Sequence, residues 1–176
     1  MRIPSRIWAL LARRYDVPLP ENYENLSHSA FWDWVKSNTQ IPVILTEGAK
    51  KAAAILSCGY VAIALPGVRG GYRQPKNEYG EISGAPYLIP QLAVFAQQGR
   101  RIYFCFDADV KRTTVRDVNH AIAKTAKLLS SRGCEVKVMT WHSALGKGID
   151  DILAACGRDK LDSIYSNALN LNDGTL

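Results

Sequence analysis

Residues 43–67 read VILTEGAKKAAAILSCGYVAIALPG, and this stretch decides the fold class. The apolar run 43–46 is typical of a buried strand, and the alanine-rich segment 49–58 is typical of a helix that ends at Gly59. Residues 60–65 form a second strand-like run before a Pro-Gly turn. A strand, a helix and a strand in this order form a βαβ unit with parallel strands. The stretch therefore predicts an α/β fold.

The chain after this stretch continues the alternation. Residues 101–106 and 135–141 are strand-like, and a long helix is expected between them at 114–132. Combined with the first unit, the pattern predicts a Rossmann-like core of about four parallel strands flanked by helices. Shorter helices are expected at 89–98, 150–155 and 161–168.

The segment before residue 41 predicts an N-terminal helical extension. Apolar residues recur at helical spacing within 5–15, and a second helix is expected at 28–36 behind the cap residue Ser27. We therefore expect two parts, the helical extension at 1–40 and the α/β domain at 41–176.

The composition indicates a folded, basic chain. Its 176 residues are 47% hydrophobic, which is enough to bury a core, and its net charge of +6 favours a polyanionic partner. No run of about 18 apolar residues and no cleavable signal peptide is recognisable, so no membrane contact is expected. The four cysteines never form a C-x-x-C pair, which is typical of reduced thiols in a cytoplasmic protein.

Carboxylates follow two of the predicted strands. Glu47 ends the first strand before Gly48, and Asp107 and Asp109 follow the strand 101–106. Ligands of parallel sheets bind beyond the carboxyl ends of the strands, so we expect these acids at one functional edge. Oxygen ligands that converge in this way favour Mg²⁺ or Mn²⁺ over zinc. In the alternative interpretation, Glu47 caps the next helix and the two aspartates lie in a solvated loop.

The passages TEGAKKAAAILSCGYVAIALPGV, RRIYFCFDAD, GCEVKVMTW and GKGIDDIL resemble a Toprim domain, the fold shared by bacterial-type primases, topoisomerases and certain nucleases. The resemblance covers about residues 41–156 and is greatest to plasmid and phage primase or primase-helicase replication proteins. It implies that Glu47 is the general base of nucleotidyl transfer or the general acid of strand rejoining. It also implies that Asp107 and Asp109 bind Mg²⁺.

The resemblance is weaker at some positions near these acids. Asp150 resembles an acid that approaches the metal in primases, although capping of its own helix explains it equally well. Many Toprim domains have an acid where this sequence has Lys51, and many primases have Ala-Gly where residues 110–112 read Val-Lys-Arg.

Basic residues are expected near the same edge. The Gly- and Pro-rich stretch 67–86 is expected to be a functional loop or a mobile insertion. Its first part combines cations with a tyrosine, which suits phosphate contacts and base stacking, although a merely solvated loop is the alternative. The predicted nucleic-acid-binding residues are Lys50, Lys51, Arg69, Tyr72, Arg73, Lys76, Lys111 and Arg112.

The resemblance implies Mg²⁺-dependent phosphoryl transfer on nucleic acid by the Toprim part of a DNA primase or replication protein. The partners would be single-stranded or template DNA and nucleotides. No second nucleotide-holding subdomain or zinc module is recognisable, so primer synthesis is expected to need further replication domains or a helicase. The alternatives are a Toprim-type metal-dependent nuclease and a non-catalytic nucleic-acid-binding module, in which Lys51 and Lys111 have replaced acidic character.

Overall fold

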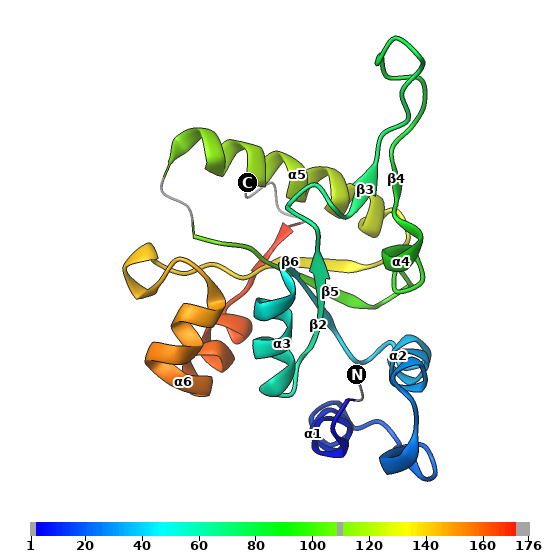
Figure 1. The fold of residues 1–176 in the computed structure, drawn as a ribbon, viewed down its shortest axis with the longest axis vertical. Helices are drawn as coiled ribbons and strands as arrows, with labels where there is room; N and C mark the ends of the chain where they lie inside the picture. The colour runs from blue at the N-terminus through cyan, green and yellow to red at the C-terminus, as the bar shows by residue number, and fades with distance from the viewer. Residues whose placement is uncertain (1–2, 109–110, 172–176) are drawn as a thin grey trace.

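A computed structural model describes residues 3–108 and 111–171 and has an α/β fold built on a five-stranded sheet (Figure 1). The strand order is β2-β1-β5-β6-β7, in which the first four strands are parallel and β7 is antiparallel to β6. The bounds are β1 Val43–Glu47, β2 Val61–Leu65, β5 Arg101–Cys105, β6 Glu135–Val138 and β7 Leu169–Asn170. The predicted parallel sheet flanked by helices is confirmed. The short strand β7 was not predicted, because its two exposed residues carry no strand pattern.

Helices cover both faces of the sheet, because the strand side chains alternate between two apolar clusters. Val43 and Leu45 belong to the larger cluster, whereas Ile44 between them belongs to the smaller one. The larger cluster contains side chains of α1, α2, α4 and α5, and the smaller one contains side chains of α3 and α6. The bounds are α1 Ser5–Tyr15, α2 His28–Ser37, α3 Ala49–Ser57, α4 Pro90–Ala93, α5 Arg112–Ser130 and α6 Ile149–Ser166.

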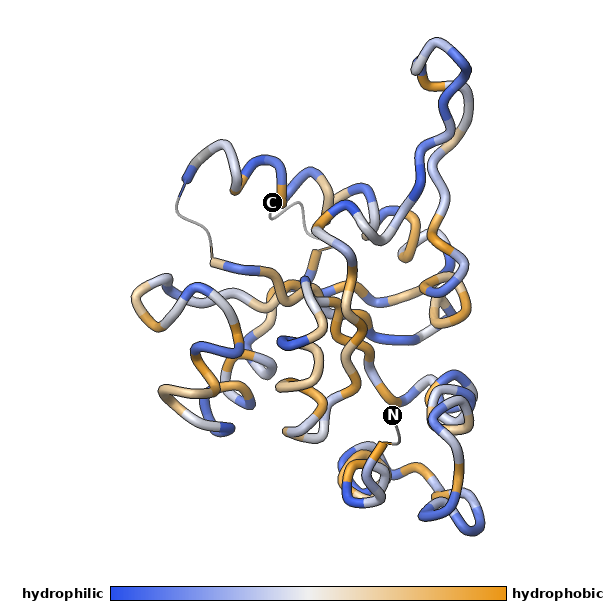
Figure 2. The backbone as a smooth tube through the Cα atoms, in the orientation of Figure 1, coloured by the Kyte–Doolittle hydropathy of each residue, from blue (hydrophilic) through white to orange (hydrophobic). Residues whose placement is uncertain are grey.

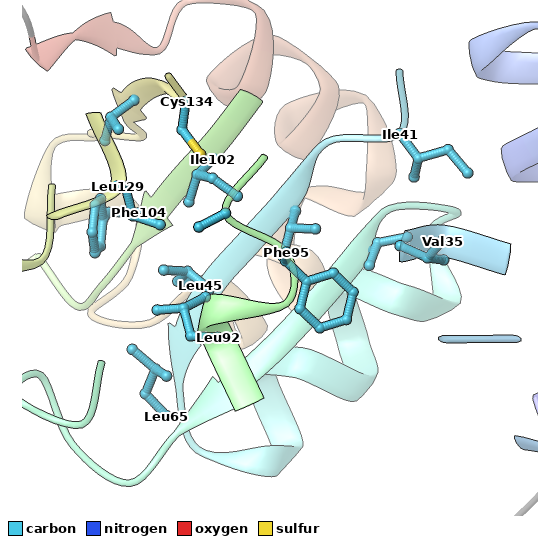
Figure 3. Close-up of a cluster of buried hydrophobic side chains, with 14 of the residues drawn as sticks. Val35, Ile41, Leu45, Leu65, Leu92, Phe95, Ile102, Phe104, Leu129 and Cys134 are labelled. Atoms are coloured by element: carbon cyan, nitrogen blue, oxygen red, sulfur yellow. The ribbon is translucent and has the colours of Figure 1, made fainter. Parts of the chain in front are cut away.

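The larger cluster joins the middle of the sheet to helices on its face. Figure 3 shows Leu45 and Ile102, from the adjacent strands β1 and β5, close to Leu92 and Phe95. Figure 2 shows that the strands of the five-stranded sheet are mainly apolar. Within the described ranges, no helix combines the length and apolar character needed to cross a membrane.

The helix expected at 89–98 is wrong in its length, since α4 is only Pro90–Ala93. Phe95 follows it into the larger apolar cluster, and the side-chain oxygen of Gln97 accepts a hydrogen bond from Arg100 at 2.8 Å. After Ala93 the backbone continues in tighter turns, in which the Phe95 N–H donates to the carbonyl of Leu92 and the Ala96 N–H donates to the carbonyl of Ala93, instead of extending the α-helix.

The terminal helix expected at 150–155 lies within α6, and the one expected at 161–168 lies within it up to Ser166, where α6 ends. The helical geometry is interrupted at Gly157, whose φ of 73° and ψ of −172° are outside the helical region. The prediction of two helical segments with a break between them is therefore confirmed, although the break is a kink inside one element.

The stretch 67–86 contains most of a β-hairpin, which the sequence interpretation as a loop or insertion did not include. β3 (Tyr72–Arg73) pairs antiparallel with β4 (Tyr87–Leu88), and the side chain of Asn77 accepts backbone hydrogen bonds in the turn. Strands of two residues leave no alternating pattern in the sequence. We call residues 71–88 the hairpin arm, which projects beyond α5 in Figure 1.

The N-terminal helices share the larger apolar cluster with the sheet. Trp8 of α1 packs against Phe31 and Trp34 of α2, with ring centroids 5.1 Å apart in each pair. Ser27 caps α2 as expected, since its hydroxyl accepts a hydrogen bond from the backbone N–H of Ala30. The division at residue 40 stays a prediction, but the buried side chains on its two sides form one cluster.

Arg100 connects these helices to the sheet. It is fully buried just before β5, and its guanidinium donates hydrogen bonds to the carbonyls of Val35 at 3.0 Å, Lys36 at 2.8 Å and Ile41 at 2.7 Å. The last carbonyls of a helix lack intrahelical partners, so Arg100 satisfies the end of α2. Burial lowers the pKa of Arg100 to about 10, which leaves the group charged at neutral pH.

Replacing Arg100 should therefore destabilise the fold strongly. Arg100→Met leaves several buried carbonyls without donors, and we expect a loss of about 3 kcal/mol or more in the free energy of unfolding. Arg6→Ala, at an exposed position of α1, serves as the control and should cost less than about 0.5 kcal/mol. Urea unfolding measures both, and a loss below about 1 kcal/mol for Arg100→Met would contradict this role.

Candidate active site

The pairing of β1 with β5 brings Glu47 and Asp107 to the same edge of the sheet. Thr46 is in register with Cys105, so Glu47, the last residue of β1, and Asp107, two residues after β5, lie at two neighbouring strand ends. Gly48 comes next with φ of 86°, a left-handed conformation that favours glycine, and α3 begins at Ala49. The first turn of α3 therefore lies at this edge as well.

Lys51 of α3 forms an ion pair with Asp107. Its Nζ lies 2.5 Å from Asp107 Oδ1, and both side chains are 19% exposed. Partial burial opposes protonation of Lys51, but the hydrogen bond to Asp107 and the negative charges of Asp107, Asp150 and Glu47 outweigh it. The pKa of Lys51 is therefore raised, and the group is a fixed cation among carboxylates.

Asp150 reaches the same edge from the start of α6. The N–H of Ala108, just after Asp107, donates to the carbonyl of Lys147 at 2.9 Å, which holds the segment before α6 against the end of β5. Asp150 Oδ2 lies 3.1 Å from Lys50 Nζ. Partial burial opposes ionisation of Asp150, but the hydrogen bonds from Lys50 and from its own backbone N–H outweigh it and lower its pKa.

Gly148 lies in the middle of this group of charged residues. A Cβ at Gly148 would be 2.6 Å from Asp150 Oδ1, 2.8 Å from Lys51 Cε and 3.4 Å from Asp107 Oδ1. Three elements, the end of β5, α3 and the start of α6, therefore meet at a position that has room for no side chain. In the sequence, the second glycine of the segment GKGIDDIL is the signal for this close approach.

Some of the charged residues at this edge suit a divalent cation, and others compete with it. Carboxylate oxygens are the ligands that Mg²⁺ prefers, and Asp107 is positioned to supply one. Within residues 3–108 and 111–171, however, no three His, Cys, Asp or Glu side chains lie close enough to hold a metal. The predicted ligand Asp109 lies outside the described residues. A divalent ion bound at Asp107 would have to share this carboxylate with Lys51 or displace Lys51.

The predicted nucleic-acid-binding residues lie in two places. Lys50 and Lys51 are at the edge where Glu47, Asp107 and Asp150 lie, which we call the carboxylate edge. Exposed Lys111 precedes α5, and the side chain of Arg112 lies outside the described part. Arg69, Arg73 and Lys76 are exposed at the base of the hairpin arm or along it. Three of the predicted cations already have carboxylate partners, since Lys50 pairs with Asp150, Lys51 pairs with Asp107, and Arg69 lies 3.6 Å from Asp117.

Tyr72 is poorly placed for the predicted base stacking. It is 7% exposed, and Lys124 Nζ lies 5.7 Å from its ring centroid, so the ring presents little surface to a base. The exposed tyrosines of the hairpin arm are Tyr79 and Tyr87, at 80% and 51% exposure. These two tyrosines were not predicted as binding residues, because exposure has no local sequence signal in a hairpin this short.

Two comparisons with known proteins cover this site. A family described as "Domain of unknown function (DUF3854)" matches residues 31–160, from within α2 to within α6. An uncharacterized protein of Picosynechococcus sp. is 42% identical over 168 residues, which are 95% of this chain and 16% of that protein. The chain thus spans about a sixth of the length of this relative. The family match contains all the elements that meet at the carboxylate edge.

The lowered pKa of Asp150 should make stability depend on pH at its acidic end. Ionised Asp150 contributes stability above its ordinary pKa of 3.8, and this contribution is lost as the pH falls through the lower folded value. Because Lys50 is largely exposed, we expect only about 0.5–1 kcal/mol, or roughly 2 °C in the melting temperature.

Melting curves of the native chain and of Asp150→Asn at several pH values measure this effect. The difference should be largest near neutral pH and should shrink as the pH falls below 3.8. Asp159→Asn, at an exposed position later in α6, is the matched control. A difference that is the same at pH 3 and pH 7 would contradict the ionic contribution of Asp150.

Proposed function

The chain belongs to the DUF3854 family of domains of unknown function, and we propose that it carries out Mg²⁺-dependent phosphoryl transfer on nucleic acid. We propose further that it is the Toprim part of a DNA primase or another replication protein. One observation carries the proposal. Glu47 is the last residue of β1, Asp107 lies two residues after the end of the adjacent parallel strand β5, and the start of α6 brings Asp150 to the same edge.

The chemistry of this edge suits phosphoryl transfer. A divalent ion on Asp107, with Asp109 as the second proposed ligand, would neutralise the charge that develops on a phosphoryl group. Glu47, proposed as the general base, would accept the proton of the attacking hydroxyl. The net charge of +6 and the cations at positions 69, 73 and 76 would attract the backbone of single-stranded or template DNA.

The ion pair between Lys51 and Asp107 favours a second candidate function. An ammonium group that already neutralises Asp107 reduces the need for a metal, as expected of a non-catalytic nucleic-acid-binding module. The two candidates differ in what happens when a divalent ion is added. A catalytic edge binds the ion and loses the ion pair between Lys51 and Asp107, whereas a binding module keeps that ion pair.

Thermal melting in millimolar Mn²⁺ tests the metal. Bound ion at about ten times its dissociation constant stabilises the fold by about 1.4 kcal/mol, or roughly 4 °C for a chain of this size. We expect this rise in the native chain and a larger rise in Lys51→Met, which removes the competing ammonium. Asp107→Asn/Asp109→Asn should show none. Equal shifts in the native chain and the double variant would contradict metal binding at this edge.

A primer-synthesis assay with template, nucleoside triphosphates and Mn²⁺ tests the reaction. Positioning of both reactants supplies about 7–11 kcal/mol of barrier reduction, so we expect primers only with further replication domains or a helicase. Glu47→Gln should then reduce labelled product by at least about 100-fold.

The other outcomes of this assay separate the alternatives. If the chain cleaves DNA in a metal-dependent reaction and Glu47→Gln abolishes the cleavage, the result would support a nuclease and contradict a primase. If DNA binding persists in EDTA and in Asp107→Ala, and no primers or cleavage products form, the result would support a non-catalytic binding module. Primers made by the isolated chain and abolished by Glu47→Gln would support the site and contradict the need for further domains.

A further inference from the structure

A pocket of about 180 Å³ lies directly beside Asp107. One wall is formed by Phe106 and Asp107 after β5, a second by Val118 and neighbouring residues of α5, and a third by Trp141 and its neighbours after β6. Most of the lining is apolar. Nothing in the proposed chemistry of Glu47 and Asp107 requires an apolar pocket at this position.

The size of the pocket fits a single flat ring. An apolar cavity of about 150 Å³ accommodates benzene, whereas pockets for drug-sized ligands measure roughly 300–1,000 Å³. Val118, Ile122 and Trp141 provide apolar surface for the faces of such a ring. Asn119 and Thr140 also line the pocket and offer an amide and a hydroxyl to polar atoms at the ring edge.

A groove with basic residues adjoins the pocket. It is lined by Arg69, Arg116 and His120, together with Asp117, and Asn119 lines both the groove and the pocket. Asp117 lies 3.6 Å from Arg69, but both side chains are more than half exposed, so this pair is weak and can exchange for another anion. The combined site therefore offers a ring-sized apolar pocket next to a cationic surface.

We propose that this pocket binds one nucleobase of a nucleic-acid strand whose phosphates lie along the groove with Arg69 and Arg116. The base lies between the apolar side chains of α5 and Trp141, and Asn119 contacts its polar edge. The inference rests on the proposed function, because it identifies what the carboxylate edge acts on. Since Asp107 lines the pocket, a base bound there holds the strand next to the proposed metal ligand.

Equilibrium binding in EDTA tests the pocket apart from any metal chemistry. The probes are fluorescently labelled oligo(dT) and an abasic backbone of the same length, measured by anisotropy. We expect the native chain to bind oligo(dT) about tenfold more tightly than the abasic backbone, because base contacts add to the phosphate contacts. Equal affinities for the two probes would overturn the proposal.

Val118→Phe fills the pocket and should bring the affinity for oligo(dT) down to that for the abasic backbone. The affinity for the abasic backbone should stay unchanged, since the groove is intact. Val94→Phe makes the same substitution at an exposed position next to α4 and should leave both affinities unchanged. A Val118→Phe chain that folds with the native melting temperature and keeps its preference for oligo(dT) would overturn the proposal.

Tryptophan fluorescence provides a measurement that does not depend on the folding of Val118→Phe. Thymidine 5′-monophosphate should quench the fluorescence of the native chain, and ribose 5-phosphate should not. Trp141→Phe should lose this quenching, while the remaining three tryptophans keep their signal. Quenching that persists in Trp141→Phe, or that is absent from the native chain, would overturn the proposal.

Binding and catalysis fail independently in these experiments. A preference for oligo(dT) without phosphoryl transfer would support nucleobase binding in the pocket and contradict the proposed reaction. Phosphoryl transfer without this preference would support the reaction and contradict nucleobase binding in the pocket.

Discussion

The parallel pairing of β1 with β5 is the constraint on which the candidate site depends. Val43 is in register with Ile102, and both are fully buried at the centre of the sheet, so the pairing is fixed by the core. Successive strand residues point to opposite faces, so a shift of one residue would turn Asp107 away from α3. The register therefore determines both the apolar clusters and the ion pair between Lys51 and Asp107.

Arg100 extends this constraint to the N-terminal helices. It directly precedes β5, and its guanidinium holds the carbonyl end of α2, which lies 65 residues earlier in the chain at Val35. A charged group that is buried is tolerated when neutral oxygens satisfy most of its donors, and here they accept from both terminal nitrogens of Arg100, although its Nε has no partner among the described residues. These carbonyls explain how one arginine can attach a helical segment to a sheet. The family match begins inside α2, so the match includes the end of that helix.

The parts of the fold that the sequence predicted are those with a local pattern. The runs at 43–46 and 101–106 are apolar and bounded by turn or acidic residues, and Gly59 marks the end of α3. The parts that it missed depend on contacts between distant residues. Lys51 and Asp107 are 56 positions apart, and no periodicity relates them. For the candidate site, the sequence placed Glu47 and Asp107 at one edge, but it could not show that a lysine lies between the acids or that Gly148 makes room for it.

Charge balance explains how this edge can hold several carboxylates without a bound ion. Lys50 and Lys51 are consecutive in the first turn of α3, and they pair with Asp150 and Asp107 respectively. Asp150 and Asp107 thus each have a cation within hydrogen-bonding distance, which offsets the repulsion that clustered acids would otherwise experience. The same pairing implies competition, since a divalent ion gains less from Asp107 when an ammonium must first be displaced. Lysines in the first turn of α3 would therefore weaken the metal binding that we propose at this edge. A lysine that a metal displaces would remain beside the metal and be free to contact a phosphate oxygen.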